Sequence, residues 1–284
     1  MTTNNNISPL PWYTDIAEQQ HRLSYSYGEV YPLYTLANTM LPFQIIRTHR
    51  SNGIQSIVLH TADGKQSWDV TTEVGQFIQV HQFADYGYDV IIFGGRLPVF
   101  NNQLSGQYYA TISDGTQTWW SEVWTVVQDI TPYLRIEWYD YDDFVFDGGR
   151  ICYKQAGFHN ELYFASEIGK PEYTFNEEGE NRDGYFFPEK QISEKTYKFT
   201  ILAPEYLCDV MRFIRMADVV VIRDKYGRIY NCDTFLMTPK WQTQGNLASV
   251  EIEFETDTVA KKIMMRPVGG DFNNDFNDDF FIHQ

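Results

Sequence analysis

The chain has 284 residues, of which 43% are hydrophobic, so it is long enough for one large or two medium domains and too apolar for an intrinsically disordered protein. An aromatic content of 17% argues against a helical bundle, because aromatic side chains favour strands and interfaces. The net charge of −16 argues against direct binding of nucleic acid, since contact with the phosphate backbone needs clustered Lys and Arg.

Residues 1–38 are predicted to form an extended N-terminal arm. Its prolines, Pro9 and Pro11, disfavour regular structure, and it lacks the basic and apolar regions of a secretory signal. Terminal arms become ordered when they pack against another surface. We expect Trp12 of this arm to contact a neighbouring molecule. No apolar run approaches the roughly 20 residues that a membrane span requires, so we expect synthesis in the cytoplasm and no membrane partner.

Residues 39–130 are predicted to form an immunoglobulin-like β-sandwich. Short strands separated by turn residues at this spacing are typical of a sandwich or a related barrel. The two predicted hairpins join strand 43–48 to strand 54–60 through Asn52-Gly53, and strand 108–113 to strand 118–127 through Asp114-Gly115-Thr116.

Residues 131–266 are predicted to form a second β domain with one helix at about 204–216. Strand 194–201 alternates apolar and polar residues, which is the period of a half-buried strand, and Pro204 favours the start of a helix. A hairpin over 219–237 follows. Strand 248–255 closes the domain with the cleanest alternation in the chain; its residues predicted to point inward are Ala248, Val250, Ile252 and Phe254.

Two clusters of acidic residues fall within this second domain. The first has a carboxylate spacing that matches no EF-hand, and we interpret it as the acidic face of a strand and loop; it contains Glu137, Asp140, Asp142, Asp143 and Asp147. The second lies between Pro171 and Pro188 and indicates a long exposed loop or extended hairpin, a kind of segment that often contacts partners. We favour a subunit contact there over a metal site, with Glu177, Glu178 and Glu180 as the candidate residues.

Residues 267–284 form an acidic tail that repeats Asp, Phe and Asn with a period of four residues. Alone in water such a segment buries almost nothing and is expected to be disordered. Two interpretations stay open: the tail is a solvated low-complexity terminus, or Phe272, Phe276 and Phe280 anchor it to the surface of a partner.

Motifs for catalysis are absent from the sequence. There is no nucleophile elbow, zinc-protease helix, phosphate loop or dinucleotide-binding loop, and the six histidines are scattered singly. The three cysteines, Cys152, Cys208 and Cys232, fit no disulfide framework and are expected to be reduced core thiols. We therefore predict a protein that is not an enzyme and needs no cofactor or metal.

Two stretches resemble a known group of proteins. GQYYATISDGTQTWWSEVW, residues 106–124, resembles the last hairpin of immunoglobulin-like domains in structural proteins of tailed phages and prophages of gut Bacteroidetes. Residues 170–258 are similar to the downstream part of the same proteins, including RDGYFFPEK at 182–190 and APEYLCD at 203–209. The order of strand, helix, hairpin and strand over 194–255 also resembles, more weakly, the ring-forming domain of distal tail proteins.

The resemblance implies a non-catalytic virion protein: a subunit of the tail, baseplate, neck or tail ring, present in several copies. Its expected partners are itself, as a homo-oligomeric ring, and other tail proteins; the expected location is the virion, after synthesis in the cytoplasm of the host bacterium. The tail repeat is not part of the resemblance.

Two alternatives to this function stay open. A carbohydrate-binding module or adhesin would use exposed tryptophans from among Trp68, Trp119, Trp120 and Trp124, and a glycoside hydrolase would use the cluster from Asp140 to Asp147.

The expected fold class is therefore mainly β. We predict an N-terminal immunoglobulin-like β-sandwich followed by a second β domain carrying one α-helix, with extended termini.

Overall fold

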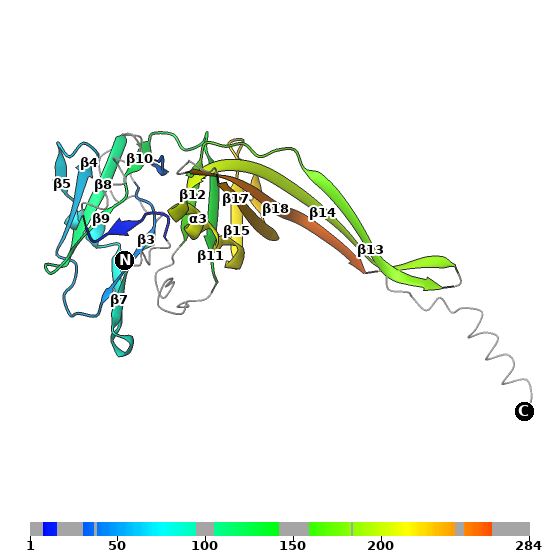
Figure 1. Cartoon of the computed structure of the whole chain (residues 1–284), viewed down its shortest axis with the longest axis horizontal. Helices are drawn as coiled ribbons and strands as arrows, with labels where there is room; N and C mark the ends of the chain where they lie inside the picture. Colours follow the sequence, from blue (N-terminus) through cyan, green and yellow to red (C-terminus); the bar gives the residue numbers. More distant parts are fainter. Residues whose placement is uncertain are drawn as a thin grey trace, which may run out of the picture.

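The computed structural model describes residues 8–15, 31–36, 39–94, 105–141, 159–182, 184–241 and 247–262. Over these ranges the fold is mainly β, as predicted, with four sheets and short helices. Buried hydrophobic side chains from all four sheets belong to one continuous core cluster. The two predicted β domains therefore share a core, and a long ribbon formed by β13 (Glu172–Arg182), β14 (Tyr185–Pro204) and β18 (Leu247–Lys262) extends from this common body (Figure 1).

Two sheets make up the N-terminal part. Glycine and Asx-type turns separate their short strands, as expected for residues of this kind. The seven-stranded sheet contains β1 (Trp12–Tyr13), β9 (Thr118–Ser121), β8 (Gly106–Ser113), β10 (Trp124–Val127), β2 (Tyr34–Leu36), β4 (Ser56–Thr61) and β5 (Ser67–Asp69). The three-stranded sheet contains β3 (Phe43–Thr48), β7 (Tyr88–Phe93) and β6 (Ile78–Phe83), and the short helices here are α2 (Thr71–Gly75) and η1 (Ala84–Tyr86).

Trp12 is a correction to the predicted N-terminal arm. It lies in β1, which pairs antiparallel with β9, and its side chain is only 5% exposed. Its ring packs against Phe43 with 4.7 Å between ring centroids. The hydroxyl of Tyr13 donates a hydrogen bond to the buried carboxylate of Glu122 at 3.1 Å. Because β1 completes the sheet of its own chain, Trp12 is a core residue and is not available to a neighbouring molecule.

The predicted hairpin around Asn52-Gly53 is also corrected. Strand β3 pairs with β7, whereas β4 pairs with β5 and β8, so the turn connects two different sheets. The hairpin at Asp114 is confirmed, because β8 pairs with β9 and Gly115 adopts the positive φ of +81° that favours glycine. Its return strand is divided into β9 and β10, and both parts pair with β8.

Two further sheets make up the C-terminal part, together with the predicted helix. Pro204, the last residue of its strand, comes directly before the helix, which a 3-10 turn follows. One sheet has the order β12 (Asn160–Phe164), β11 (Leu134–Tyr139), β15 (Val219–Arg223) and β16 (Ile229–Asn231). The other has the order β13 (Glu172–Arg182), β14 (Tyr185–Pro204), β18 (Leu247–Lys262) and β17 (Thr234–Trp241); the helical segments are α3 (Glu205–Met211) and η3 (Ile214–Met216).

The alternation predicted for strand 248–255 is confirmed in β18. Val250, Ile252 and Phe254 are fully buried, whereas the acidic residues between them are partly exposed. The apolar face of α3 belongs to the same core cluster. Burial raises the pKa of the Cys208 thiol to about 11 and that of Cys232 to about 12, so both stay protonated at neutral pH. Cys152 lies outside the described residues.

Candidate interaction surface

A ribbon of strands extends beyond the core of the last sheet. We define the β-arm as β13, residues 185–195 of β14 and residues 256–262 of β18. Figure 1 shows these strands running as a long bent ribbon away from the rest of the molecule. The last fully packed row of this sheet is Tyr197 opposite Phe254. The β-arm is therefore held by backbone pairing to a sheet whose core it does not join.

Large hydrophobic side chains cover the β-arm without being buried. None of its hydrophobic residues is among the buried core, although aromatic side chains are the most favourable ones to bury. The exposed fractions are 72% for Tyr173, 62% for Phe175, 73% for Tyr185, 46% for Phe186, 39% for Phe187 and 62% for Val259. Aromatic residues are enriched at protein–protein interfaces, so their exposure on the β-arm makes it the candidate interaction surface.

The acidic candidates of the sequence lie on the outer strand of this arm. Glu177 and Glu178 are exposed residues of β13, and Glu180 follows towards the tip. Glu177 accepts a hydrogen bond from the amide of Gln191 at 2.6 Å, and Glu178 lies 3.5 Å from the ammonium of Lys190. In the described ranges no group of three or more His, Cys, Asp or Glu side chains is arranged to hold a metal ion.

Gly179 shapes the β-arm at a position that motif searching missed. The pairing of β13 with β14 shifts by one residue between Glu178 and Gly179. A Cβ atom at position 179 would collide with the backbone carbonyl of Phe187. The bulge therefore requires glycine, and bulges of this kind bend and twist a ribbon. The only signal in the sequence was a glycine within a strongly polar strand.

The remaining candidates are placed as follows. Glu137 makes an ion pair with Arg135 at 3.2 Å, and its carboxylate lies 3.1 Å from Nδ1 of His159. Asp140 accepts a hydrogen bond from the backbone N–H of Asp218. The other members of that acidic cluster and the candidate residues of the tail lie outside the described residues: Asp142, Asp143, Asp147, Phe272, Phe276 and Phe280.

The tryptophans of the carbohydrate-binding alternative are mostly unavailable. Trp119 is 2% exposed and Trp124 is fully buried, so neither ring can stack on a sugar. Trp120 is partly buried, and Trp68 is 41% exposed at the edge strand β5. Among these four tryptophans, Trp68 is therefore the most exposed candidate for stacking on a sugar, and its ring lies 6.2 Å from that of Tyr108 between centroids.

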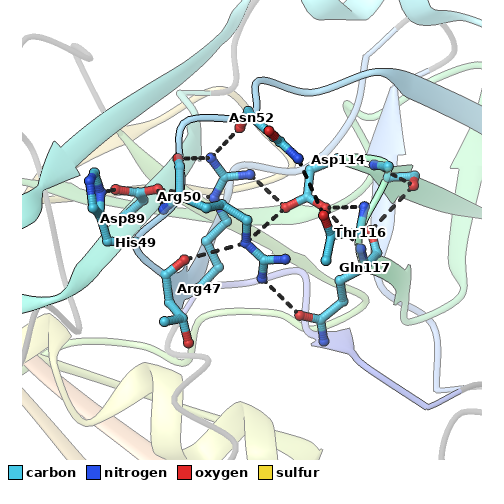
Figure 2. A network of polar contacts seen from close by, with 11 residues as sticks. Arg47, His49, Arg50, Asn52, Asp89, Asp114, Thr116 and Gln117 are labelled. Carbon is cyan, nitrogen blue, oxygen red and sulfur yellow. Dashed lines mark hydrogen bonds and ion pairs between the residues drawn. The ribbon is translucent and has the colours of Figure 1, made fainter.

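A network of buried charged side chains lies in the N-terminal part (Figure 2). The guanidinium of Arg47 lies 3.2 Å from Asp89 and 2.7 Å from Asp114, and all three side chains are completely buried. Arg47 also donates to the backbone carbonyls of Arg50 and Asn52. Every group has its counter-charge, so the network ties β3, β7 and the Asp114 turn together and presents no free reactive group.

The pKa of Asp89 shows how this network responds to acid. Burial by itself raises that pKa, but the hydrogen bonds from His49, the backbone of Arg50 and Arg47 outweigh it, and the net pKa is lowered. Asp114 behaves alike, since the backbone N–H groups of Gln117 and Thr116 and the side chain of Arg47 outweigh its burial. Both carboxylates are thus held ionised in the fold.

Acid should therefore weaken the fold in a defined window. A lowered folded-state pKa contributes stability that is fully present above the unfolded value of about 3.9 and is lost as the pH falls through the folded value. We expect the free energy of unfolding to fall steeply below about pH 4. Urea unfolding followed by tryptophan fluorescence at several pH values measures this, and Asp89→Asn should flatten the slope. An unchanged slope in that variant would contradict the assignment.

The comparisons with known proteins give no relative. No family model, no curated protein and no solved structure matches this chain. Among the described residues, no helix is both long and apolar enough to cross a membrane.

Proposed function

We propose that the chain is a non-catalytic structural subunit of a multi-copy assembly, and that it acts through protein–protein contacts of the β-arm. The observation that carries the proposal is the exposure of Tyr173, Phe175 and Tyr185 on a ribbon with no core of its own. Leaving aromatic surface in water forgoes the free energy of burial, about 25 cal/mol per Å². A partner surface that covers the arm recovers it.

The phage virion is the assembly that the sequence resemblance favours, in the tail, baseplate, neck or tail ring. An extended ribbon suits such a subunit, because it reaches a neighbour while the body keeps its own core. Of the aspartates that the glycoside hydrolase alternative would use, only Asp140 lies among the described residues, where its carboxylate accepts a hydrogen bond from the backbone N–H of Asp218. The virion role rests on the resemblance, and the contact role rests on the β-arm.

Shortening the β-arm tests the proposal directly. Replacing residues 176–192 with Asn-Gly joins Phe175 to Ser193, which already face each other, through a two-residue hairpin turn. None of the residues in this segment whose burial is described is buried, so the melting temperature should change by only a few degrees. The variant should be lost from particles purified from cells that express it, whereas the wild-type chain should be present in constant copy number by mass spectrometry.

Two results would oppose the proposal. Incorporation of the shortened chain at wild-type level would show that the β-arm makes no essential contact. Absence of the wild-type chain from particles, together with binding on a glycan array or turnover of a glycoside, would favour one of the two alternatives instead.

A further inference from the structure

The β-arm has two open strand edges. In the sheet order, β13 is terminal, and no strand of the described chain pairs with its outer edge. On the other side β17 pairs with β18 only as far as Glu255, so residues 256–262 of β18 have no described strand beside them. Unpaired edges carry rows of free backbone N–H and C=O groups, which are templates for pairing with another strand.

The two edges carry opposite charges. The outer edge strand β13 has exposed Glu177 and Glu178, and the free part of β18 ends in exposed Lys261 and Lys262. Neither lysine has an ion-pair partner among the described residues. Like charges directly opposite each other destabilise a strand pair. Pairing β13 with β13, or β18 with β18, is therefore disfavoured in a symmetric dimer.

The register of the β-arm places these charges at the same level along its length. Gln191 of β14 faces Glu177 on one side and Lys261 on the other. Lys190 faces Glu178 and Lys262 in the same way. Directly opposed residues of antiparallel strands point to the same face. Each glutamate thus shares both its level and its face with one lysine, on opposite edges of one ribbon.

One pair of apolar residues also lies at the same level and on the same face of the β-arm, on its two opposite edges. Ser193 faces Phe175 on one side and Val259 on the other. Both side chains are 62% exposed, and both point to the face on which Glu177 and Lys261 lie. The two edges are therefore complementary at three levels, with one apolar pair and two pairs of opposite charge.

We propose that the occupant of these edges is a second copy of this chain. The outer edge of β13 in one copy pairs with residues 256–262 of β18 in the next, without an offset along the strands. The junction is parallel, because β13 and β18 run in the same direction in each copy. It brings Phe175 beside the partner subunit's Val259, Glu177 beside the partner subunit's Lys261, and Glu178 beside the partner subunit's Lys262.

This contact deepens the proposed function and rests on it. It joins two different edges, so it is heterologous, and every copy keeps one edge free for the next. Repetition of such a contact gives a closed ring when the rotation between copies closes, and a filament when it does not. A continuous sheet made of arms is the expected product.

Charge reversal on each edge tests the pairing in the full-length protein. Glu177→Lys with Glu178→Lys, or Lys261→Glu with Lys262→Glu, should weaken self-association at least about tenfold in sedimentation over a concentration series. The variant with all four changes should restore it. Asp85→Lys with Asp209→Lys, at exposed sites of the body, is the matched control and should associate like wild type. Failure of the four-change variant to recover would overturn the register.

A disulfide gives an independent test. Within one chain, residues 175 and 259 are separated by β14, which puts their Cα atoms roughly 10 Å apart, beyond the ~7 Å reach of a disulfide. Oxidised Phe175→Cys/Val259→Cys should therefore give a ladder of covalent oligomers on a non-reducing gel. The wild-type chain, whose described cysteines are buried or partly buried, should stay monomeric there.

The outcomes separate this inference from the role it rests on. A wild-type chain that oligomerises and enters particles, but forms no ladder in the cysteine variant, would overturn the edge contact and leave the structural role standing. A chain that sediments as a monomer at every concentration and forms no ladder would overturn the homotypic contact. Absence of the chain from particles would overturn the structural role itself.

Discussion

Replacing Arg47 with Met is expected to lower the free energy of unfolding by about 3–5 kcal/mol, the range for breaking a buried ion pair. The change leaves the carboxylates of Asp89 and Asp114 completely buried with their shared counter-charge removed. It also removes donors from the backbone carbonyls of Arg50 and Asn52. The loss should appear as a lower midpoint in urea unfolding monitored by tryptophan fluorescence.

The control for this prediction is an ion pair of similar length on the surface. Lys240 lies 2.6 Å from Glu251, and its side chain is 65% exposed. Lys240→Met should change stability by less than about 1 kcal/mol, because water screens such pairs. Adding Asp114→Asn to Arg47→Met should recover part of the loss, since one buried charge is removed with its partner. Equal effects of Arg47→Met and Lys240→Met would show that the network does not hold the sheets together.

Truncating Phe254 to Ala is expected to cost about 3–5 kcal/mol, the usual effect of deleting a core phenylalanine. The ring is fully buried and has three aromatic neighbours: Tyr197 at 5.4 Å, Tyr230 at 5.6 Å and Phe199 at 6.2 Å between centroids. Its loss leaves a cavity where β14, β16 and β18 meet. The melting temperature and the urea midpoint should both fall.

The neighbouring residue supplies the control. Glu253 points to the opposite face of β18, where its carboxylate lies 3.4 Å from the ammonium of Lys198 with 38% of the side chain exposed. Glu253→Gln should therefore change stability by less than about 1 kcal/mol. Similar small effects of Phe254→Ala and Glu253→Gln on melting would contradict the burial of this strand.

Local patterns in the sequence were enough for several elements. Apolar and polar residues alternate around Val250 and Ile252 with the two-residue period of a strand. This pattern predicts one buried face and one solvent-exposed face, whichever strands lie beside it. Gly115 marks a turn because the turn needs a positive φ, which is a property of a few residues only. The helix after Pro204 follows from spacing and proline in the same way. These signals are local, and tertiary contacts did not override them.

The pairing of strands was decided by the tertiary structure. The Asn52-Gly53 turn has a hairpin signal, yet β3 joins β7 instead, and the buried charges of Arg47, Asp89 and Asp114 lie between the two sheets. Which strands meet depends on side chains that are distant in sequence, as Asp114 is from Arg47. No window of neighbouring residues contains that information.

The sequence by itself determined the fold class, the helix after Pro204, the turn at Gly115 and the buried face of β18, because each depends on residues within a few positions of one another. Only the tertiary structure decided that Trp12 is a core residue, since its partner Phe43 is 31 positions away and lies in a different sheet, so that the contact depends on how the two sheets pack. It also decided that the acidic segment is part of a ribbon whose two edges have no other strand of the described residues beside them. Burial depends on what surrounds a side chain in three dimensions. The sequence pattern of a strand is therefore the same whether its aromatic residues are covered by the same chain or remain exposed to a partner.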